Sequence, residues 1–204
     1  MAEDIHELMK HLGFDHIRIL GHDIGMLVAY AYAASYPGEV ERLVILDGIL
    51  VGIEPATSDF MVDPRSWVFG LHQTPELPEM LVAGREREYL TWFYRTIAAN
   101  SNAIGATEVD EYVRAYSAPG AMSAGFEWFR AFPKNMEFNQ ASSQNKLRIP
   151  VLTMGGAMTQ GPKMLAMIQS VAEDVRGGPI PDCGHWIAEE KPEVLLAQLM
   201  EFLP

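Results

Sequence analysis

The chain has 204 residues, of which 49% are apolar, and its 27 acidic and 15 basic side chains give a formal charge of -12 at pH 7. This length and apolar content suit one domain of ordinary size, or a domain with an insertion, that buries a sizeable core. The negative charge would repel nucleic acid and anionic lipid unless a local basic patch overrode it, and the sequence shows no such patch. The apolar runs fall short of the roughly 18 residues that a membrane span needs.

The first quarter of the chain predicts an alternation of helices and strands. Apolar residues at three-to-four-residue spacing predict an amphipathic helix over residues 2–12, and HIRIL (16–20) predicts a short strand. The stretch 24–36 is apolar nearly all round, which predicts a buried helix that ends at a Pro-Gly pair. RLVILDG (42–48) is a continuous run of leucine and β-branched residues, typical of a parallel strand covered on both faces.

The pattern changes after these elements and returns near the end of the chain. Residues 53–146 contain several aromatic-rich helical patterns, which predict a helical lid. A strand at 149–156, an apolar helix, a short extended stretch at 175–181 and a last helix follow. We therefore expect an α/β fold with a mostly parallel sheet flanked by helices. Residues 1–52 and 147–204 form its core, and the lid is inserted between two strands.

A carboxylate stands at the corner between the first strand and the helix that follows it. In GHDIG (21–25), Asp23 lies between two glycines, as in the nucleophile elbow, whose tight strand-to-helix turn needs small residues. The dipole and the free N–H groups at the start of a helix favour a negative charge at this place. Asp23 is therefore a candidate nucleophile, and the alternative is that its side chain only caps the helix.

A histidine lies where a general base would follow such a nucleophile. His185, in PDCGHW (181–186), comes in a loop after the last predicted strand and before the final helix. This is the place of the histidine in the chain order nucleophile, acid, histidine. Asp23 and His185 together predict catalysis by a nucleophile and a base.

The elbow, the helical lid, the Gly-Gly pair after residue 154 and the DCGHW ending resemble the α/β-hydrolase superfamily, in its branch of epoxide hydrolases, haloalkane dehalogenases and haloacetate dehalogenases. The resemblance implies a partial α/β-hydrolase fold in which Asp23 attacks a saturated carbon and forms an alkyl-enzyme ester. It implies that His185 activates the water that hydrolyses this ester, and that the Ile24 N–H holds the oxyanion. No metal ion or organic cofactor is implied.

The resemblance leaves a choice for the acid that orients the histidine. Many relatives carry it in the loop after the strand that corresponds to 149–154, but GGAMTQGP contains no carboxylate. Others carry it at the end of the strand after the elbow helix, and there LVILDG supplies Asp47, at the separation from Asp23 that haloacetate dehalogenase-like relatives show. Asp47 is the predicted acid. The alternatives are that Asp47 only forms a turn, or that Asp182 takes this role.

The lid departs from the pattern of epoxide-opening relatives. The positions that match their hydrogen-bond donors are occupied by Val68 and Phe129, and neither side chain can donate a proton. Side chains that can substitute as donors are His72, Tyr112, Tyr116 and Trp128.

The same neighbourhood bears on the substrate. Ile24 and Leu27 stand where haloacetate dehalogenases place arginines, which disfavours an acidic substrate and favours a small, neutral, apolar epoxide. Trp67 and Trp128 offer indole N–H groups for a halide, so a haloalkane dehalogenase-like activity is an alternative. The predicted substrate-binding residues are His22, Trp67, His72, Trp128, Phe129 and Trp186.

An HG-aromatic-P-like loop does not precede the elbow strand, so the second oxyanion donor of the family has no counterpart in the sequence. The strand at 16–20 would then form an edge of the sheet with unpaired backbone groups. We expect this edge to form a homo-oligomer or to bind a complementing chain, and the alternative is that the chain represents a shortened gene product. The alternative to an enzyme is a catalytically silent remnant of the fold that acts as a binding partner.

Three further residues bear on compartment and metal binding. Cys183 is the only cysteine, which excludes an internal disulfide, favours a reducing compartment such as the cytoplasm, and suits a buried apolar role. A lost leader would change this assignment. His6 and His11 in HELMKH are five residues apart, so they do not share the helix face of a zinc-protease motif, and both are expected at the surface.

Overall fold

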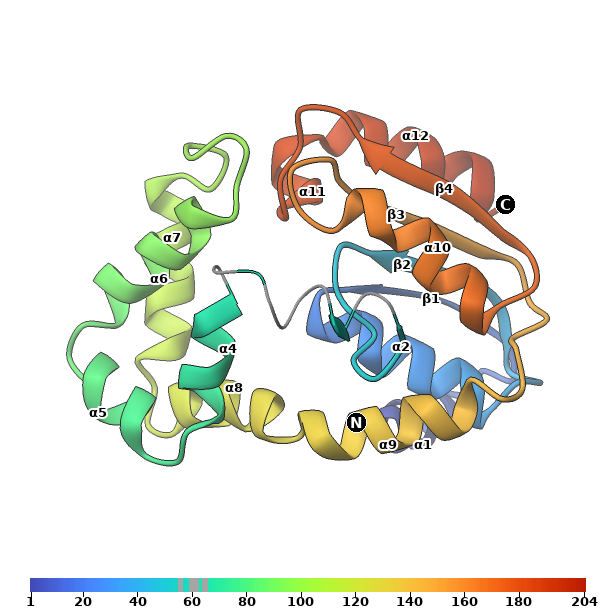
Figure 1. The fold of residues 1–204 in the computed structure, drawn as a ribbon, viewed down its shortest axis with the longest axis horizontal. Helices are drawn as coiled ribbons and strands as arrows, with labels where there is room; N and C mark the ends of the chain where they lie inside the picture. The colour runs from blue at the N-terminus through green and yellow to red at the C-terminus, as the bar shows by residue number, and fades with distance from the viewer. Residues whose placement is uncertain (55–56, 59–62, 64–65) are drawn as a thin grey trace.

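A computed structural model of the chain describes residues 1–54, 57–58, 63 and 66–204. In this part of the chain, four parallel strands form one sheet in the order β1-β2-β3-β4, with helices on both faces (Figure 1). The α/β fold with a mostly parallel sheet is therefore confirmed. The strands are β1 (Ile17–His22), β2 (Val40–Leu46), β3 (Val151–Gly156) and β4 (Val175–Ile180).

The parallel register brings the ends of the strands to one edge of the sheet. His22 at the end of β1 pairs with Leu46 at the end of β2, and Leu46 pairs with Met154 in β3. Residues that directly follow β1 and β2 therefore leave the sheet side by side. In open α/β sheets this carboxyl edge is where ligands bind.

The two faces of the sheet carry separate apolar clusters, because alternate residues of a strand point to opposite sides. Leu43 and Ile45 of β2 pack in one cluster with α2 (Ile24–Ser35) and α10 (Gly161–Val171). Val44 and Leu46 pack in the other cluster with α12 (Pro192–Phe202). All four β2 side chains are buried, which explains the continuous apolar run of this strand.

Helix α2 is apolar nearly all round because it is covered on two sides. It packs against β1 and β2 on one side and against α1 (Ala2–Leu12) on the other. Its buried side chains include two tyrosines, Tyr30 and Tyr32. The expectation that His6 of α1 lies at the surface is wrong, because its ring stacks on Tyr36 and its Nδ1 lies 2.9 Å from a carboxylate oxygen of Glu39.

The helices between β2 and β3 lie beyond the carboxyl edge of the sheet and return to it through α9 (Figure 1). Arg130 joins two of them, since its guanidinium donates to both carboxylate oxygens of Glu79 at 2.8 and 2.9 Å. These lid helices are α4 (Trp67–Gln73), α5 (Leu77–Val82), α6 (Glu86–Thr96), α7 (Ala106–Tyr116), α8 (Ala121–Arg130) and α9 (Phe132–Ser142). The short helix α11 (Ile187–Glu190) precedes α12.

Two further expectations agree with the structure. Strand β1 lies at the edge of the sheet formed by the described residues, and Cys183 is fully buried. Within the described ranges, every helix is too short or too polar to cross a bilayer.

Candidate active site

Asp23 occupies a strained corner between β1 and α2. Its φ of 53° and ψ of −123° are unusual for a residue with a Cβ, and such a backbone costs about 1–3 kcal/mol. The corner is tight because a Cβ on Gly21 would lie 2.2 Å from the carbonyl oxygen of Gly25. Glycine is therefore required at position 21. At position 25 an added Cβ would meet open space, so only one of the two glycines in GHDIG is needed for clearance.

The Asp23 carboxylate faces His185 and does not cap its own helix. No side-chain hydrogen bond caps α2, whereas Asp23 Oδ2 lies 3.6 Å from His185 Nε2. The Asp23 side chain is 41% exposed, so its oxygens are open to a ligand on the side away from the backbone. The capping alternative is therefore wrong.

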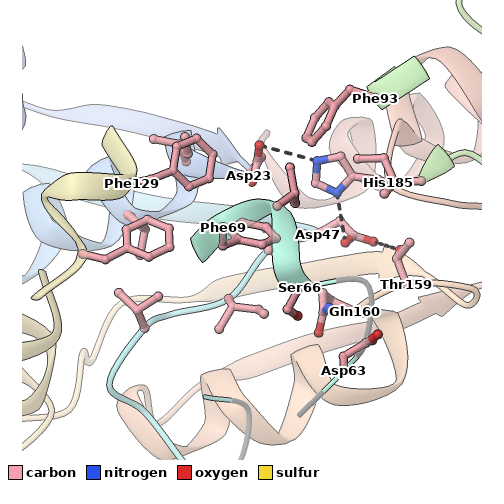
Figure 2. A pocket seen from close by; sticks show the side chains of 18 residues that line it. Asp23, Asp47, Asp63, Ser66, Phe69, Phe93, Phe129, Thr159, Gln160 and His185 are labelled. Atoms are coloured by element: carbon pink, nitrogen blue, oxygen red, sulfur yellow. Dashed lines mark hydrogen bonds and ion pairs between the residues drawn. The ribbon is translucent and has the colours of Figure 1, made fainter. Parts of the chain in front are cut away.

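Asp47 lies on the other side of the His185 ring. Its Oδ1 is 3.3 Å from His185 Nδ1, and its side chain is fully buried. The second oxygen, Oδ2, accepts hydrogen bonds from the Gly156 N–H at 2.6 Å and from the Thr159 hydroxyl at 2.5 Å. These bonds fix the carboxylate beside the ring, and Figure 2 shows Asp47 between His185 and Thr159. Asp182, the rival acid, is exposed.

The two carboxylates determine the protonation of the ring between them. Desolvation would lower the pKa of His185, but the hydrogen bond and charge of Asp23, and then those of Asp47, raise it to about 10. Desolvation would also raise the pKa of Asp23, but His185 holds it below its ordinary value. At neutral pH the resting site therefore holds an imidazolium ion between two acceptors. The pKa of His22 is lowered by burial and by the charge of His185.

Two cavities meet at Asp23. The smaller one, about 110 Å³, is lined mainly by apolar side chains around Asp23 and His185 (Figure 2). The larger one, about 460 Å³, lies under the lid helices and includes Tyr94 and Tyr112. Ile24, Phe93 and Phe129 line both cavities. The Asp23 carboxylate thus borders an apolar cavity and a second cavity that also contains polar aromatic side chains.

A family model described as the alpha/beta hydrolase fold matches residues 1–192. The chain belongs to the α/β-hydrolase family. The soluble epoxide hydrolase of Corynebacterium sp. (strain C12) is 34% identical to it, over 99% of this chain and 72% of that enzyme. The crystal structure of Cfl2 from Burkholderia cenocepacia has a TM-score of 0.92 and 35% identity, over 100% of this chain and 70% of that one.

Longer relatives extend beyond the matched region. Epoxide hydrolase 1 of Caenorhabditis elegans is 26% identical over 100% of this chain but only 52% of its own length. The chain therefore spans about half the length of that relative. Together, these similarities place the hydrolase in the epoxide hydrolase branch of its family.

Most of the side chains that the sequence predicts to bind substrate line the larger cavity of the hydrolase. The exception is Trp67, which is 56% exposed, packs against Trp92 and is absent from the described lining of either cavity. Val68 and Phe129 line the smaller cavity. The residues of the predicted set in the larger cavity are His22, His72, Trp128, Phe129 and Trp186, and the proposed donors Tyr112 and Tyr116 lie there too.

His72 is the most buried of these polar side chains. Its Nε2 contacts the Tyr89 hydroxyl, and its Nδ1 has no hydrogen-bond partner among the described residues. Burial, and then the charge of Arg130, lowers the pKa of His72 to about 4. The hydrolase therefore keeps this imidazole neutral within the lid.

Sequence reasoning missed the groups that hold the triad in place. Thr159 lies in the loop where many relatives carry the acid, and here its hydroxyl binds the acid instead. Glu190 and the lid residues Tyr94 and Ile97 bind the loop that carries His185. The only local signal for this packing was the Gly-Gly pair at the end of β3. Glycine is needed there because a Cβ on Gly156 would lie 2.0 Å from the carbonyl oxygen of Gly184, next to His185. In the described part of the chain, no three acidic, histidine or cysteine side chains form a group that would hold a metal ion.

Proposed function

We propose that the chain is an epoxide hydrolase that acts through a covalent ester on Asp23. The observation that carries this proposal is the line of side chains Asp23, His185 and Asp47 at the edge of an apolar cavity. A carboxylate is already an anion at neutral pH, so it displaces a leaving group from a saturated carbon without a base. An Asp23 oxygen forms a bond to one ring carbon, the carbon–oxygen bond of the ring breaks, and the released oxygen takes up a proton.

Formation of the ester then prepares the base. Esterified Asp23 carries no charge and accepts no proton from His185, so the largest contribution that raises the pKa of His185 disappears. The proton that His185 loses balances the one that the opened ring gains. Neutral His185 takes a proton from water, and the hydroxide attacks the carbonyl carbon of the ester while the Ile24 N–H holds the oxyanion. The bond from this carbon to the alkyl oxygen then breaks, the departing oxygen takes the proton of the new carboxyl group, and the diol leaves the regenerated Asp23 carboxylate. Asp47 stabilises the imidazolium that returns.

The cavities support a neutral, largely apolar substrate. Ile24 and Leu27 line the smaller cavity beside the nucleophile, together with the rings of Phe93 and Phe129. We assign the predicted donors of the larger cavity to the released oxygen. Burial raises the pKa of Tyr112 there, so its hydroxyl stays protonated and can donate a hydrogen bond to this oxygen.

The ester is trapped when its hydrolysis is blocked. The variant His185→Gln, incubated with a panel of apolar epoxides, should gain the full mass of one epoxide, located by peptide mapping on Asp23. The variant Asp23→Asn should gain none. An adduct that lacks a halogen after incubation with an alkyl halide, but no adduct with any epoxide, would indicate a dehalogenase instead. No adduct with either class would indicate a catalytically silent protein.

A further inference from the structure

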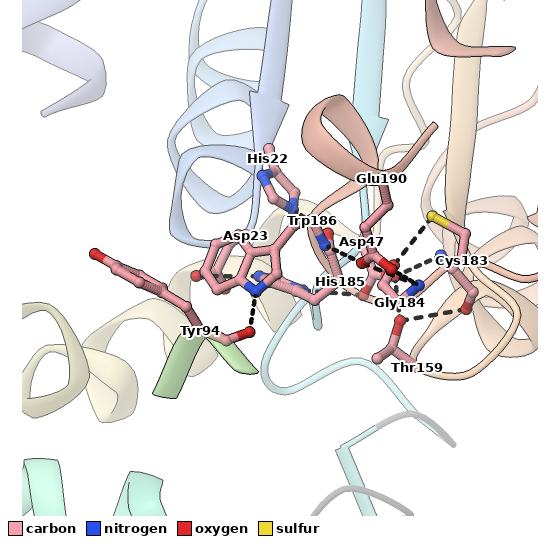
Figure 3. Close-up of polar contacts among 11 residues, drawn as sticks. His22, Asp23, Asp47, Tyr94, Thr159, Cys183, Gly184, His185, Trp186 and Glu190 are labelled. Atoms are coloured by element: carbon pink, nitrogen blue, oxygen red, sulfur yellow. Dashed lines mark hydrogen bonds and ion pairs between the residues drawn. The ribbon is translucent and has the colours of Figure 1, made fainter. Parts of the chain in front are cut away.

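One carboxylate, that of Glu190, joins the lid to the loop that carries the base, and Figure 3 shows it beside Gly184 and Trp186 of this loop. Glu190, the last residue of α11, accepts hydrogen bonds through Oε2 from the backbone N–H groups of Ala99 at 2.8 Å and Asn100 at 3.0 Å. The Gly184 N–H lies 3.1 Å from both of its oxygens, and the Trp186 N–H donates to Oε1 at 3.2 Å. Two of these donors belong to the lid and two flank His185 in the chain.

His185 is held by its backbone as well as by its ring. Its N–H donates to the carbonyl oxygen of Ile97 at 2.9 Å. Its own carbonyl oxygen lies 2.9 Å from Nε2 of His22, at the end of β1. The next residue, Trp186, donates its indole N–H to the carbonyl oxygen of Tyr94 at 2.8 Å. The lid and the core thus each fix one side of the His185 peptide.

The two segments touch through their backbones, with no space for a side chain between them. A Cβ on Gly184 would lie 2.4 Å from the nitrogen of Ala99 and 2.6 Å from the oxygen of Ile97. At this approach several N–H groups converge, and they need an acceptor that reaches all of them. The Glu190 carboxylate is that acceptor. An amide of the same shape would direct its own N–H groups toward donors.

From these contacts we propose that Glu190 is a positioning residue for the base. It holds the lid segment 97–100 against the loop 183–186 and so keeps His185 Nε2 within reach of the ester on Asp23. Asp47 contacts only the ring of His185, through Nδ1, so the backbone of the loop must be held by other residues. The proposal rests on the ester mechanism proposed above, because the hydrolytic step is the one that requires Nε2 to align a water molecule.

The two chemical steps should respond differently to loss of the carboxylate. In Glu190→Gln, ester formation should keep its rate, because Glu190 has no hydrogen bond to Asp23 or to the elbow. Ester hydrolysis should slow about 10- to 100-fold, because displacement of a catalytic group by about 1 Å has effects of this size. The ester should therefore accumulate, and kcat should fall more than the rate of alkylation. Rapid-quench mass measurement gives both rates.

The matched control is Glu193→Gln, which neutralises an exposed carboxylate in the first turn of α12. It should leave both rates unchanged. Glu190→Asp keeps the charge but shortens the reach, and its hydrolysis rate should lie between those of the native chain and Glu190→Gln. This variant carries the test if Glu190→Gln does not fold. In the Glu190 variants, hydrogen exchange of backbone amides should become faster in peptides that contain residues 97–100 or 183–186. The increase should be larger there than in any other peptide.

Two results would overturn the proposal. Equal slowing of both steps would mean that Glu190 only supports the fold, and hydrolysis at the native rate would mean that other contacts position His185. Failure of the ester mechanism is a separate outcome, since His185→Gln would then trap no adduct, whatever the behaviour of Glu190 variants.

Discussion

At the scale of single residues, the site depends on one histidine shared by two acids. The distances from His185 to Asp23 and Asp47 are similar, 3.6 and 3.3 Å, but the two carboxylates differ in exposure. Asp47 has no exposed surface, and its second oxygen is occupied by Gly156 and Thr159. Asp23 is open to the cavities. Only the exposed carboxylate, Asp23, can therefore be reached and esterified by a substrate, and the buried Asp47 remains a fixed negative charge.

This asymmetry predicts the pH dependence of ester hydrolysis. In the resting chain the pKa of His185 is raised to about 10, with Asp23 as the largest cause of the increase. Once Asp23 is esterified, the pKa must fall, and neutral His185 becomes available at lower pH. Decay of a preformed ester, followed in single turnovers from pH 5 to 10, should reach its plateau well below pH 10. A rate that still rises tenfold per pH unit above pH 8 would contradict this mechanism.

At the scale of elements, the elbow depends on close contact between the end of β1 and the start of α2. A Cβ at position 21 would overlap the Gly25 carbonyl group, whereas a Cβ at position 25 would meet no atom within 4 Å. The two glycines look equivalent in the sequence. Their roles differ because the strand approaches the helix on one side of the corner only.

The two glycines therefore provide a matched pair of variants. Gly21→Ala should lower the free energy of unfolding by about 1–3 kcal/mol, the usual cost of overpacking, and should reduce ester formation by displacing Asp23. Gly25→Ala should be neutral or should stabilise the helix by up to about 1 kcal/mol. Urea unfolding measures the free energy of unfolding of both variants. Equal changes for the two variants would show that the corner relaxes around an added methyl group.

The elements were predictable where their own sequence determines them. The second half of β2, from Leu43, is a continuous apolar run, β3 is buried along its whole length, and α2 is apolar nearly all round, so composition alone locates them. The sequence signal for strand β4 is weaker, because VRGGPI contains two glycines. One of them, Gly177, is required because a Cβ there would lie 1.9 Å from the Thr153 carbonyl oxygen. That requirement comes from the neighbouring strand and leaves no periodic signal.

The site divides in the same way. Asp23 and His185 stand in local motifs, and the family resemblance adds Asp47. The contact of Thr159 with Asp47 joins residues 112 positions apart, and that of Glu190 with Ala99 joins residues 91 positions apart. No local pattern marks such partners, because their function arises only when the chain folds and distant segments meet.

At the scale of the whole molecule, β1 forms one of the two edges of the sheet that the structure describes. An apolar hollow of about 710 Å³ lies beside it, lined by residues of α1, β1 and α2, such as Met9 and Leu20, and by Phe14 in the loop between α1 and β1. Edge strands with unpaired backbone groups and apolar neighbours favour pairing with another strand. A second copy of the chain can pair there with two-fold symmetry, since the same edge is offered by both partners.

We therefore propose that the chain self-associates through β1. Light scattering should give a mass of at least twice 22.7 kDa at micromolar concentration. Leu20→Lys, at the edge, should shift the mass toward that of one chain, whereas Leu196→Lys, at an exposed position of α12, should not. A stable and fully active monomer would exclude this interface.

The backbone of His185 is bound on one side by Ile97 of the lid and on the other by His22 of the core. Removing or exchanging the lid helices should therefore slow turnover, even if Asp23, His185 and Asp47 are all retained. In a chimera that takes its lid from another family member, residues 94–100 should therefore be kept from this chain. We expect a graft whose boundaries leave that segment intact to change the substrates that the enzyme accepts and to keep His185, the proposed base, in place.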